Sequence, residues 1–303
     1  MLNKITLLFT LLFSCSIANA QDNLMSLLDD DSNEKKEVTS VFKGTRVLLG
    51  HSTKLRKKNE LELLISHRFG ALNSGAYEYF GLDASSIRIG LEYGVTNNIN
   101  VGWGRSSNDK TYDGFIKYKI ISQSSGQGGM PISIAWFSNI AVKTSPQAKV
   151  DSTYEFKERL SYTHQLLVSR KFSSGTSIQL MPTFVYRNRP SDLTDQDQMF
   201  IIGIGGRQKL TKSLTLNFEY FHRINPVEEN TEWYLAVNPA GQNGIEKDCF
   251  AIGFDIETGG HVFQIQFTNS ILTNERGFLT ETFDDFWSGD IHLGFNISRT
   301  FQF

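Results

Sequence analysis

The last fourteen residues, Asp290–Phe303 (DIHLGFNISRTFQF), decide the fold. Apolar and polar residues alternate along this stretch, with the two-residue period of a β-strand. A strand with one apolar and one polar face needs lipid or a protein core on one side and water on the other. The apolar positions are Ile291, Leu293, Phe295, Ile297, Phe301 and Phe303.

A chain that ends on such a strand, with a terminal phenylalanine, is typical of bacterial outer-membrane β-barrels. The stretch therefore predicts an all-β protein, an antiparallel transmembrane β-barrel. We expect Phe303 to be recognised by the outer-membrane assembly machinery.

The same alternation recurs upstream in segments of about ten residues, the length of a transmembrane strand. One such segment would be weak support, but repetition is the signature of a barrel. We predict 12 strands, with 14 as the alternative. The segments are 60–69, 87–93, 99–103, 112–120, 132–142, 160–168, 178–187, 200–207, 214–223, 250–257, 263–268 and 290–303.

Short and long connections alternate between these segments, which predicts short periplasmic turns and longer outer loops. The short ones are 96–98, 123–131, 172–176, 211–213 and 258–260, and the longer ones include 70–85, 144–157, 188–197, 225–248 and 271–288. Residues 41–49 resemble a further strand of weaker alternation. A thirteenth strand would place the N-terminus outside, so 41–49 stays in the periplasm or the lumen, or another strand lies within 231–238.

The N-terminus predicts export. Lys4 precedes an apolar run at 5–13, and Ala18-Asn19-Ala20 is a cleavage site, so residues 1–20 are predicted as a cleaved signal peptide. Lipoprotein processing at Cys15 is the alternative. We predict a polar periplasmic leader at 21–40 and a β-barrel domain at 41–303, with Cys249 the one cysteine of the mature chain.

Composition narrows the class of protein. The net charge is −2 with mixed signs, which gives no argument for a nucleic-acid partner. The mean hydropathy is −0.26, and no apolar run of helix length follows the signal, so a helical membrane protein is excluded. The predicted partners are the lipid bilayer of a Gram-negative outer membrane and small solutes.

Charged residues occupy the inward parity of the predicted strands. They either form ion pairs that fill a narrow barrel or line a hydrated path. The excess of basic over acidic residues is too small to predict anion selectivity, and an open or a plugged lumen both remain. The candidate lumen-lining residues are Arg68, Arg88, Glu92, Lys117, Lys119, Arg159, Arg187, Arg207, Glu219, Arg223, Asp255 and Glu257.

Catalytic motifs are missing from the sequence. It holds no G-x-S-x-G and no H-E-x-x-H, and no serine follows a histidine by two residues on one strand face, as in outer-membrane phospholipases. We expect no enzymatic activity, no catalytic residues, no cofactor and no metal.

Several segments resemble an uncharacterised outer-membrane β-barrel family of Bacteroidota, a domain of unknown function. They are HRFG (67–70), FGLD (80–83), IGLEYG (89–94), GRSS (104–107), DIETGGHVFQIQFTNS (255–270) and GFNISRTF (294–301). The resemblance runs from about residue 40 to the end and implies no assigned substrate or site. Within it, Arg68 and Asp83 could pair to fold the first long loop into a constriction, or Gly70 and Gly81 merely end strands.

The sequence thus predicts an integral outer-membrane barrel that acts as a passive channel for small solutes. The alternative is a non-conducting barrel that docks partner proteins through its leader and outer loops. Loop 225–248, with Trp233, Tyr234 and Leu235, is the main candidate for such docking.

Overall fold

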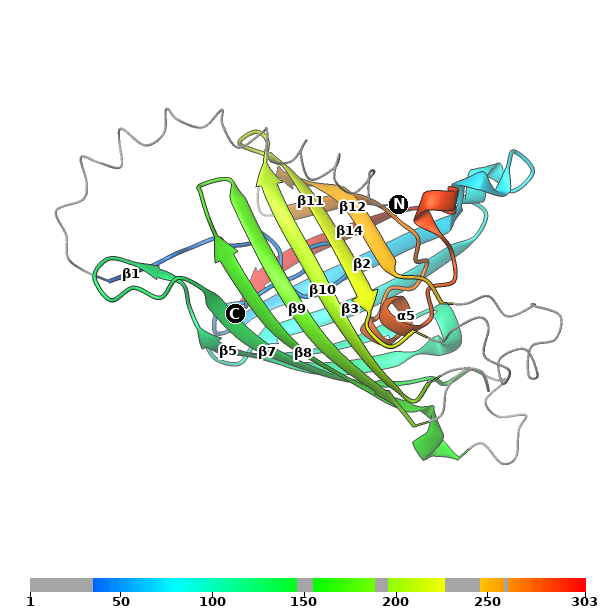
Figure 1. The fold of residues 1–303 in the computed structure, drawn as a ribbon, viewed down its shortest axis with the longest axis horizontal. Coiled ribbons are helices and arrows are strands. Elements are labelled where there is room, and N and C mark those ends of the chain that lie inside the picture. Colours follow the sequence, from blue (N-terminus) through cyan, green and yellow to red (C-terminus); the bar gives the residue numbers. More distant parts are fainter. Residues whose placement is uncertain (1–34, 146–154, 189–195, 227–245, 259–260) are drawn as a thin grey trace.

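A computed structural model describes residues 35–145, 155–188, 196–226, 246–258 and 261–303. Twelve antiparallel strands close into one barrel (Figure 1), so the predicted fold class and the strand number of 12 are confirmed. The strands are β2 (Glu60–Ala71), β3 (Ser85–Gly94), β4 (Ile99–Ser106), β5 (Tyr112–Ile121), β7 (Ser133–Val142), β8 (Leu160–Lys171), β9 (Thr176–Arg187), β10 (Gln198–Lys209), β11 (Leu214–Arg223), β12 (Cys249–Thr258), β13 (His261–Thr268) and β14 (His292–Gln302).

Each barrel strand pairs with the next one in sequence, and the C-terminal strand closes the ring. In β14, Phe301 lies opposite Leu61 of β2 and Ile297 lies opposite Ile65. Closure leaves no unpaired sheet edge, which is what a β-structure surrounded by lipid requires.

The outward face of the barrel is apolar. Leu91, Trp103, Ile116, Ile140 and Ile202 lie on it and are each 38–50 % exposed. Such a continuous apolar surface is unfavourable in water and is satisfied by the hydrocarbon of a bilayer. None of the described helices is long and apolar enough to cross a membrane.

The two ends of the barrel differ. Short turns join the strands at one end, which we call the short-turn end, and longer loops join them at the other, the long-loop end (Figure 1). A small two-stranded sheet at the short-turn end joins β1 (Lys36–Glu37) to β6 (Ser124–Ser125). The long-loop end carries short helices, which are η2 (Leu72–Ser74), η3 (Tyr79–Gly81), η4 (Asn108–Lys110), η5 (Phe156–Arg159), α5 (Glu275–Thr280) and η6 (Phe286–Ser288).

Glycine is required where the β2–β3 loop crosses the end of β2. Gly81 has φ +83°, and a Cβ atom there would lie 2.5 Å from the backbone carbon and oxygen of Gly70. The loop therefore packs backbone to backbone, which a side chain would prevent.

Residues 41–49, predicted as a weak strand, form none. Outside the named strands the structure has a single bridge here, between Arg46 and His51, and residues 45–53 are buried. The segment runs inside the ring of strands, one of the placements that the sequence left open. Because this segment lies in the lumen, the candidate functional site is an occupied lumen.

Candidate functional site: the occupied lumen

The N-terminal plug, residues 41–56, is a hairpin inside the barrel. The Ser52 amide donates to the Thr45 carbonyl at 2.9 Å, and the Val47 amide donates to the Gly50 carbonyl at 2.9 Å. The turn at 47–50 is the tip of the hairpin. Val47, Leu48 and Leu49 there are at most 4 % exposed.

Glu219 of β11 holds this tip. Its Oε2 atom accepts hydrogen bonds from the amides of Leu48, Leu49 and Gly50 at 3.1, 2.6 and 3.2 Å. Three converging N–H groups form an anion-binding nest, and hydrogen bonds to a carboxylate are stronger than neutral ones. Glu219 is fully buried, so these bonds are shielded from water.

Amide side chains of other strands bind the plug's backbone. Gln179 accepts from the Thr53 amide at 2.9 Å and donates to the His51 carbonyl at 2.7 Å. Gln264 donates to the Val47 carbonyl at 2.9 Å, and Asn296 donates to that of Leu48 at 2.8 Å.

Basic residues of the wall bind further carbonyls of the N-terminal segment. Lys117 of β5 donates to the Lys54 carbonyl at 2.8 Å. Arg207 of β10 donates to the carbonyls of Ser40 and Val41 at 3.2 and 3.4 Å, where the chain enters the barrel. Because buried backbone groups need partners, these contacts make the lumen a stable environment for the plug.

A second segment, the inner loop (residues 269–289), enters from the long-loop end. All six residues of its helix α5 are buried, and Asn274 caps the helix by accepting from the Gly277 amide. Phe278 packs against Phe221 of β11 with ring centroids 5.3 Å apart. The inner loop therefore occupies part of the lumen on the long-loop side.

The plug and the inner loop meet at Glu275. This fully buried carboxylate accepts a hydrogen bond from Arg46 of the plug, and His51 Nε2 lies 3.3 Å from its Oε1 atom. The His51 ring packs against those of Phe115 and Phe137, at centroid distances of 4.6 and 4.1 Å. The contact links two segments that enter from opposite ends.

Part of the wall around this contact is apolar, which the sequence analysis did not foresee. Inward-facing wall residues form one buried cluster with Leu48 and Leu49 of the plug and with Phe278 and Leu279 of the inner loop. The wall contributes Phe115, Phe137, Leu167, Met181, Val185, Ile201 and Phe221, among others. An inward run of apolar residues on β8 to β11 is the signal that could have indicated a filled lumen.

Several of the candidate lumen-lining charges form ion pairs inside the barrel. Arg88 donates to Asp113 at 2.9 Å, and Lys117 Nζ lies 3.1 Å from Glu92. Arg223 pairs with Glu246. A buried pair of this kind costs desolvation energy that its partner offsets, so these charges are poorly available to a permeating ion.

The other candidates have different surroundings. Arg187 donates to the Gln196 carbonyl at 2.8 Å, and Asp255 accepts from Gln264 at 2.8 Å. Arg159 ends helix η5 at the long-loop end and is partly buried. Glu257 lies on β12 opposite Val262, and its side chain is outside the described residues.

The suggested pairing of Arg68 with Asp83 is wrong. Arg68 is 1 % exposed and turns inward, where it donates to Asn296 at 3.1 Å and to the His67 carbonyl at 2.7 Å. Asp83 is exposed in the β2–β3 loop. The physical reason is the strand period, which directs Arg68 into the lumen while the loop projects beyond the strands.

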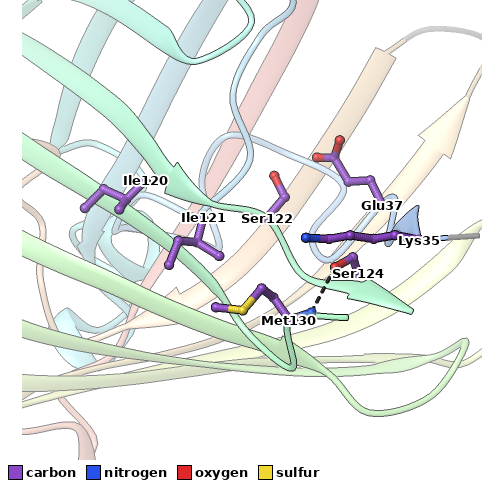
Figure 2. A pocket seen from close by; sticks show the side chains of 7 residues that line it. All are labelled: Lys35, Glu37, Ile120, Ile121, Ser122, Ser124 and Met130. Carbon is purple, nitrogen blue, oxygen red and sulfur yellow. Dashed lines mark hydrogen bonds between the residues drawn. The ribbon is translucent and has the colours of Figure 1, made fainter. Parts of the chain in front are cut away.

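The leader contacts the rim at the short-turn end, beside a cavity of about 440 Å³ (Figure 2). Lys36 and Glu37 pair with Ser125 and Ser124, and the Val38 amide donates to the Gln123 carbonyl at 2.8 Å. A hydrogen bond from Ser122 lowers the pKa of Glu37. Burial opposes this, and the charge of Lys119, 3.4 Å away, lowers the pKa further.

Lys143 anchors the inner loop at the long-loop end. Its Nζ lies 2.9 Å from Glu281 and 2.7 Å from Asp109. Burial alone would lower the pKa of Lys143, but the two carboxylates outweigh it and raise the pKa. The ammonium stays charged and holds the inner loop to the η4 loop.

Two pairs of polar side chains on the lipid-facing side resemble parts of a hydrolase site. Ser138 Oγ and His164 Nδ1 are 2.8 Å apart on neighbouring strands, and His222 Nδ1 lies 2.8 Å from Asp248. No local sequence pattern indicates the first pair, because it depends on the cross-strand register of β7 and β8. Within the described part of the chain, no acid contacts His164 to orient its ring, as the base of a serine nucleophile requires. Among the described residues no cluster of three or more His, Cys, Asp or Glu could hold a metal ion.

A closed antiparallel barrel with an apolar outer face defines a membrane-bound β-barrel of the outer-membrane type. The sequence matches the family described as "Membrane bound beta barrel domain (DUF5777)" over residues 42–301, and the chain belongs to that family. Membership of a barrel family of unknown function is therefore confirmed. None of the curated protein sequences matches the chain.

Among solved structures, the chain is similar to barrels with very different sequences. The NanC porin has 10 % identity and a TM-score of 0.47, over 80 % of this chain and 99 % of that one. The KdgM porin has 6 % identity and a TM-score of 0.43, over 80 % and 99 %. Omp33, an outer membrane protein of Acinetobacter baumannii, has 8 % identity and a TM-score of 0.40, over 81 % and 99 %.

Proposed function

We propose that this protein is an outer-membrane channel for small polar solutes that its own chain closes at rest. It opens when the N-terminal plug leaves the lumen towards the short-turn end, where the leader emerges. The observation that carries the proposal is the hydrogen-bonded fit of the plug, whose tip rests on Glu219. Polar contacts of this kind can be exchanged for water when the plug moves, unlike a purely apolar seal.

The proposal includes the export, membrane orientation and assembly of the channel that the sequence predicts. Residues 1–20 act as a cleaved signal peptide, the short-turn end faces the periplasm, and the assembly machinery recognises the terminal strand with Phe303. No enzymatic step is part of the proposal. The Ser138–His164 pair is two polar groups satisfying each other on a lipid-facing surface.

The test is single-channel conductance of the refolded mature protein in a planar bilayer. Wild type is expected to show rare, brief openings. Glu219→Ala removes the acceptor of three plug amides and is expected to give frequent, ohmic steps. Asn217→Ala is the matched control, because Asn217 lies on the same strand and face and its Nδ2 atom has no hydrogen-bond partner among the described residues.

A large steady conductance of wild type would contradict a plug that closes the barrel. If neither Glu219→Ala nor Asn217→Ala shows channel openings, although heat-dependent gel mobility verifies that the protein is folded, the proposed channel function is contradicted. That result would favour the second function, a non-conducting barrel that docks partners. The filled lumen and the exposed leader strand at Lys36 and Glu37 favour this alternative. The other docking candidate, Trp233, Tyr234 and Leu235, lies outside the described residues.

A further inference from the structure

The lumen wall recognises the plug largely through its main chain. The Gln179 side chain bonds both the carbonyl of His51 and the amide of Thr53, two residues further along. A neighbouring β-strand would bond the same two groups of an extended chain. A single glutamine thus acts as a short piece of strand.

Wall residues from across the barrel extend this pattern. Glu219 on β11 accepts from the amides of the tip. Gln264 on β13, Asn296 on β14 and Lys117 on β5 donate to carbonyls. The chain is therefore surrounded by side chains that bind groups present in every peptide.

The plug's side chains add affinity at only part of its length. Leu48 and Leu49 enter the apolar cluster, and Thr53 Oγ1 lies 2.6 Å from Ser169 Oγ of β8. Arg46 contacts Glu275 of the inner loop, and His51 contacts both Glu275 and the wall, where its ring packs against Phe115 and Phe137. The Thr45 hydroxyl donates to Glu62 of β2 at 2.6 Å. The wall therefore offers main-chain partners together with an apolar surface that accepts a leucine side chain.

We propose that the lumen is a peptide-binding conduit and that the plug occupies it as a built-in ligand. The ligand class is a short peptide with apolar side chains, held by its amides and carbonyls where the plug is held now. This inference rests on the proposed function, because a peptide enters only after the plug has withdrawn.

The experiment compares one protein with its plug locked and released. Thr53→Cys with Ser169→Cys places two sulfur atoms where oxygens now lie 2.6 Å apart, so oxidation is expected to lock the plug and reduction to free it. Leu48→Ser and Leu49→Ser loosen the plug and leave the wall intact. Cys249→Ser, in all variants, prevents mispairing.

The probe is a fluorescein-labelled peptide with the sequence of residues 47–54, VLLGHSTK, and binding is measured by fluorescence anisotropy on full-length mature protein in detergent. The reduced protein is expected to bind at least about 10-fold more tightly than the oxidised protein. Unlabelled peptide is expected to displace the probe, and maltohexaose to leave it bound. The single-cysteine variants are expected to show no redox effect.

Equal binding in the two redox states, no binding by the reduced protein, or displacement by maltohexaose would each overturn the inference. Anisotropy requires no ion flow, so its outcome is separate from that of the conductance test. If the barrel binds the peptide but shows no conductance, the channel function is contradicted and the peptide-binding site is retained. If it conducts but does not bind the peptide, the channel function is retained and the peptide-binding site is contradicted.

Discussion

Ser138 and His164 show how single residues adapt to lipid. Both side chains lie on the outward face in directly opposed register, and their hydrogen bond leaves neither group unpaired towards hydrocarbon. The Trp136 ring stacks on His164 at 5.9 Å. A polar pair on this face is tolerated because each group satisfies the other.

Ser138→Ala is expected to lower the free energy of unfolding by about 1 kcal/mol, because it leaves the His164 ring nitrogen without a partner. Urea titration in lipid vesicles, followed by gel mobility, measures the change. The double variant Ser138→Ala/His164→Leu removes both polar groups and is expected to recover most of the loss. A double variant less stable than the single one would contradict this account.

Glu37 makes the leader's docking sensitive to acid. Its pKa is lowered in the folded state, so its contribution is complete above the ordinary glutamate pKa and is lost as the pH falls through the lowered value. Below about pH 4 we expect the amide of Val38 to lose protection from hydrogen exchange. In Glu37→Gln this protection should be weak at every pH, and an unchanged pH profile would refute the role of Glu37.

Between elements, the polar part of the contact of the plug with the inner loop depends on one carboxylate, that of Glu275. Glu275→Ala would leave the buried Arg46 guanidinium without its partner, a change that typically costs about 3 kcal/mol. The pairing of the barrel strands does not depend on this contact. We therefore expect the plug to detach from the lumen before the barrel unfolds.

Hydrogen exchange distinguishes these two events. In Glu275→Ala the amide of Ser52, which closes the hairpin, should exchange about 100-fold faster, while that of Phe295 in β14 keeps its protection. The pair Arg46→Met/Glu275→Met removes both charges and is expected to restore slow exchange. Equal acceleration at both amides would mean that the barrel itself loosens.

At the scale of the whole molecule, the barrel closes without its plug. The barrel strands begin at Glu60, and β14 pairs with β2, so the described residues before them, 35–56, contribute no strand to the closed ring. The plug and the inner loop therefore lie inside a barrel whose ring of strands is already closed.

Deletion of residues 21–56 is expected to leave a folded, heat-modifiable barrel with a lower unfolding temperature and steady conductance. Deletion of 21–40 alone, which keeps the plug, is the control and should stay closed. Gel mobility and planar-bilayer recording measure both properties. A deletion variant that fails to fold would show that the plug is needed for assembly.

The wall of the barrel could be predicted from the sequence alone. The strands, their number and their outward residues could be predicted because lipid imposes a local, two-residue period that each segment shows independently. The terminal stretch from Asp290 illustrates this, since its apolar parity alone indicates which side meets lipid.

The contents of the lumen, in contrast, become known only from the folded structure. An inward polar residue such as Glu219 has the same place in the strand period whether it faces water or a plug. Its contact with Leu49 joins residues 170 positions apart, and no local pattern encodes such a separation. Residues 41–56 bind the wall largely through their backbone, which every sequence shares, so their position in the lumen becomes visible only when the ring of strands has closed around them.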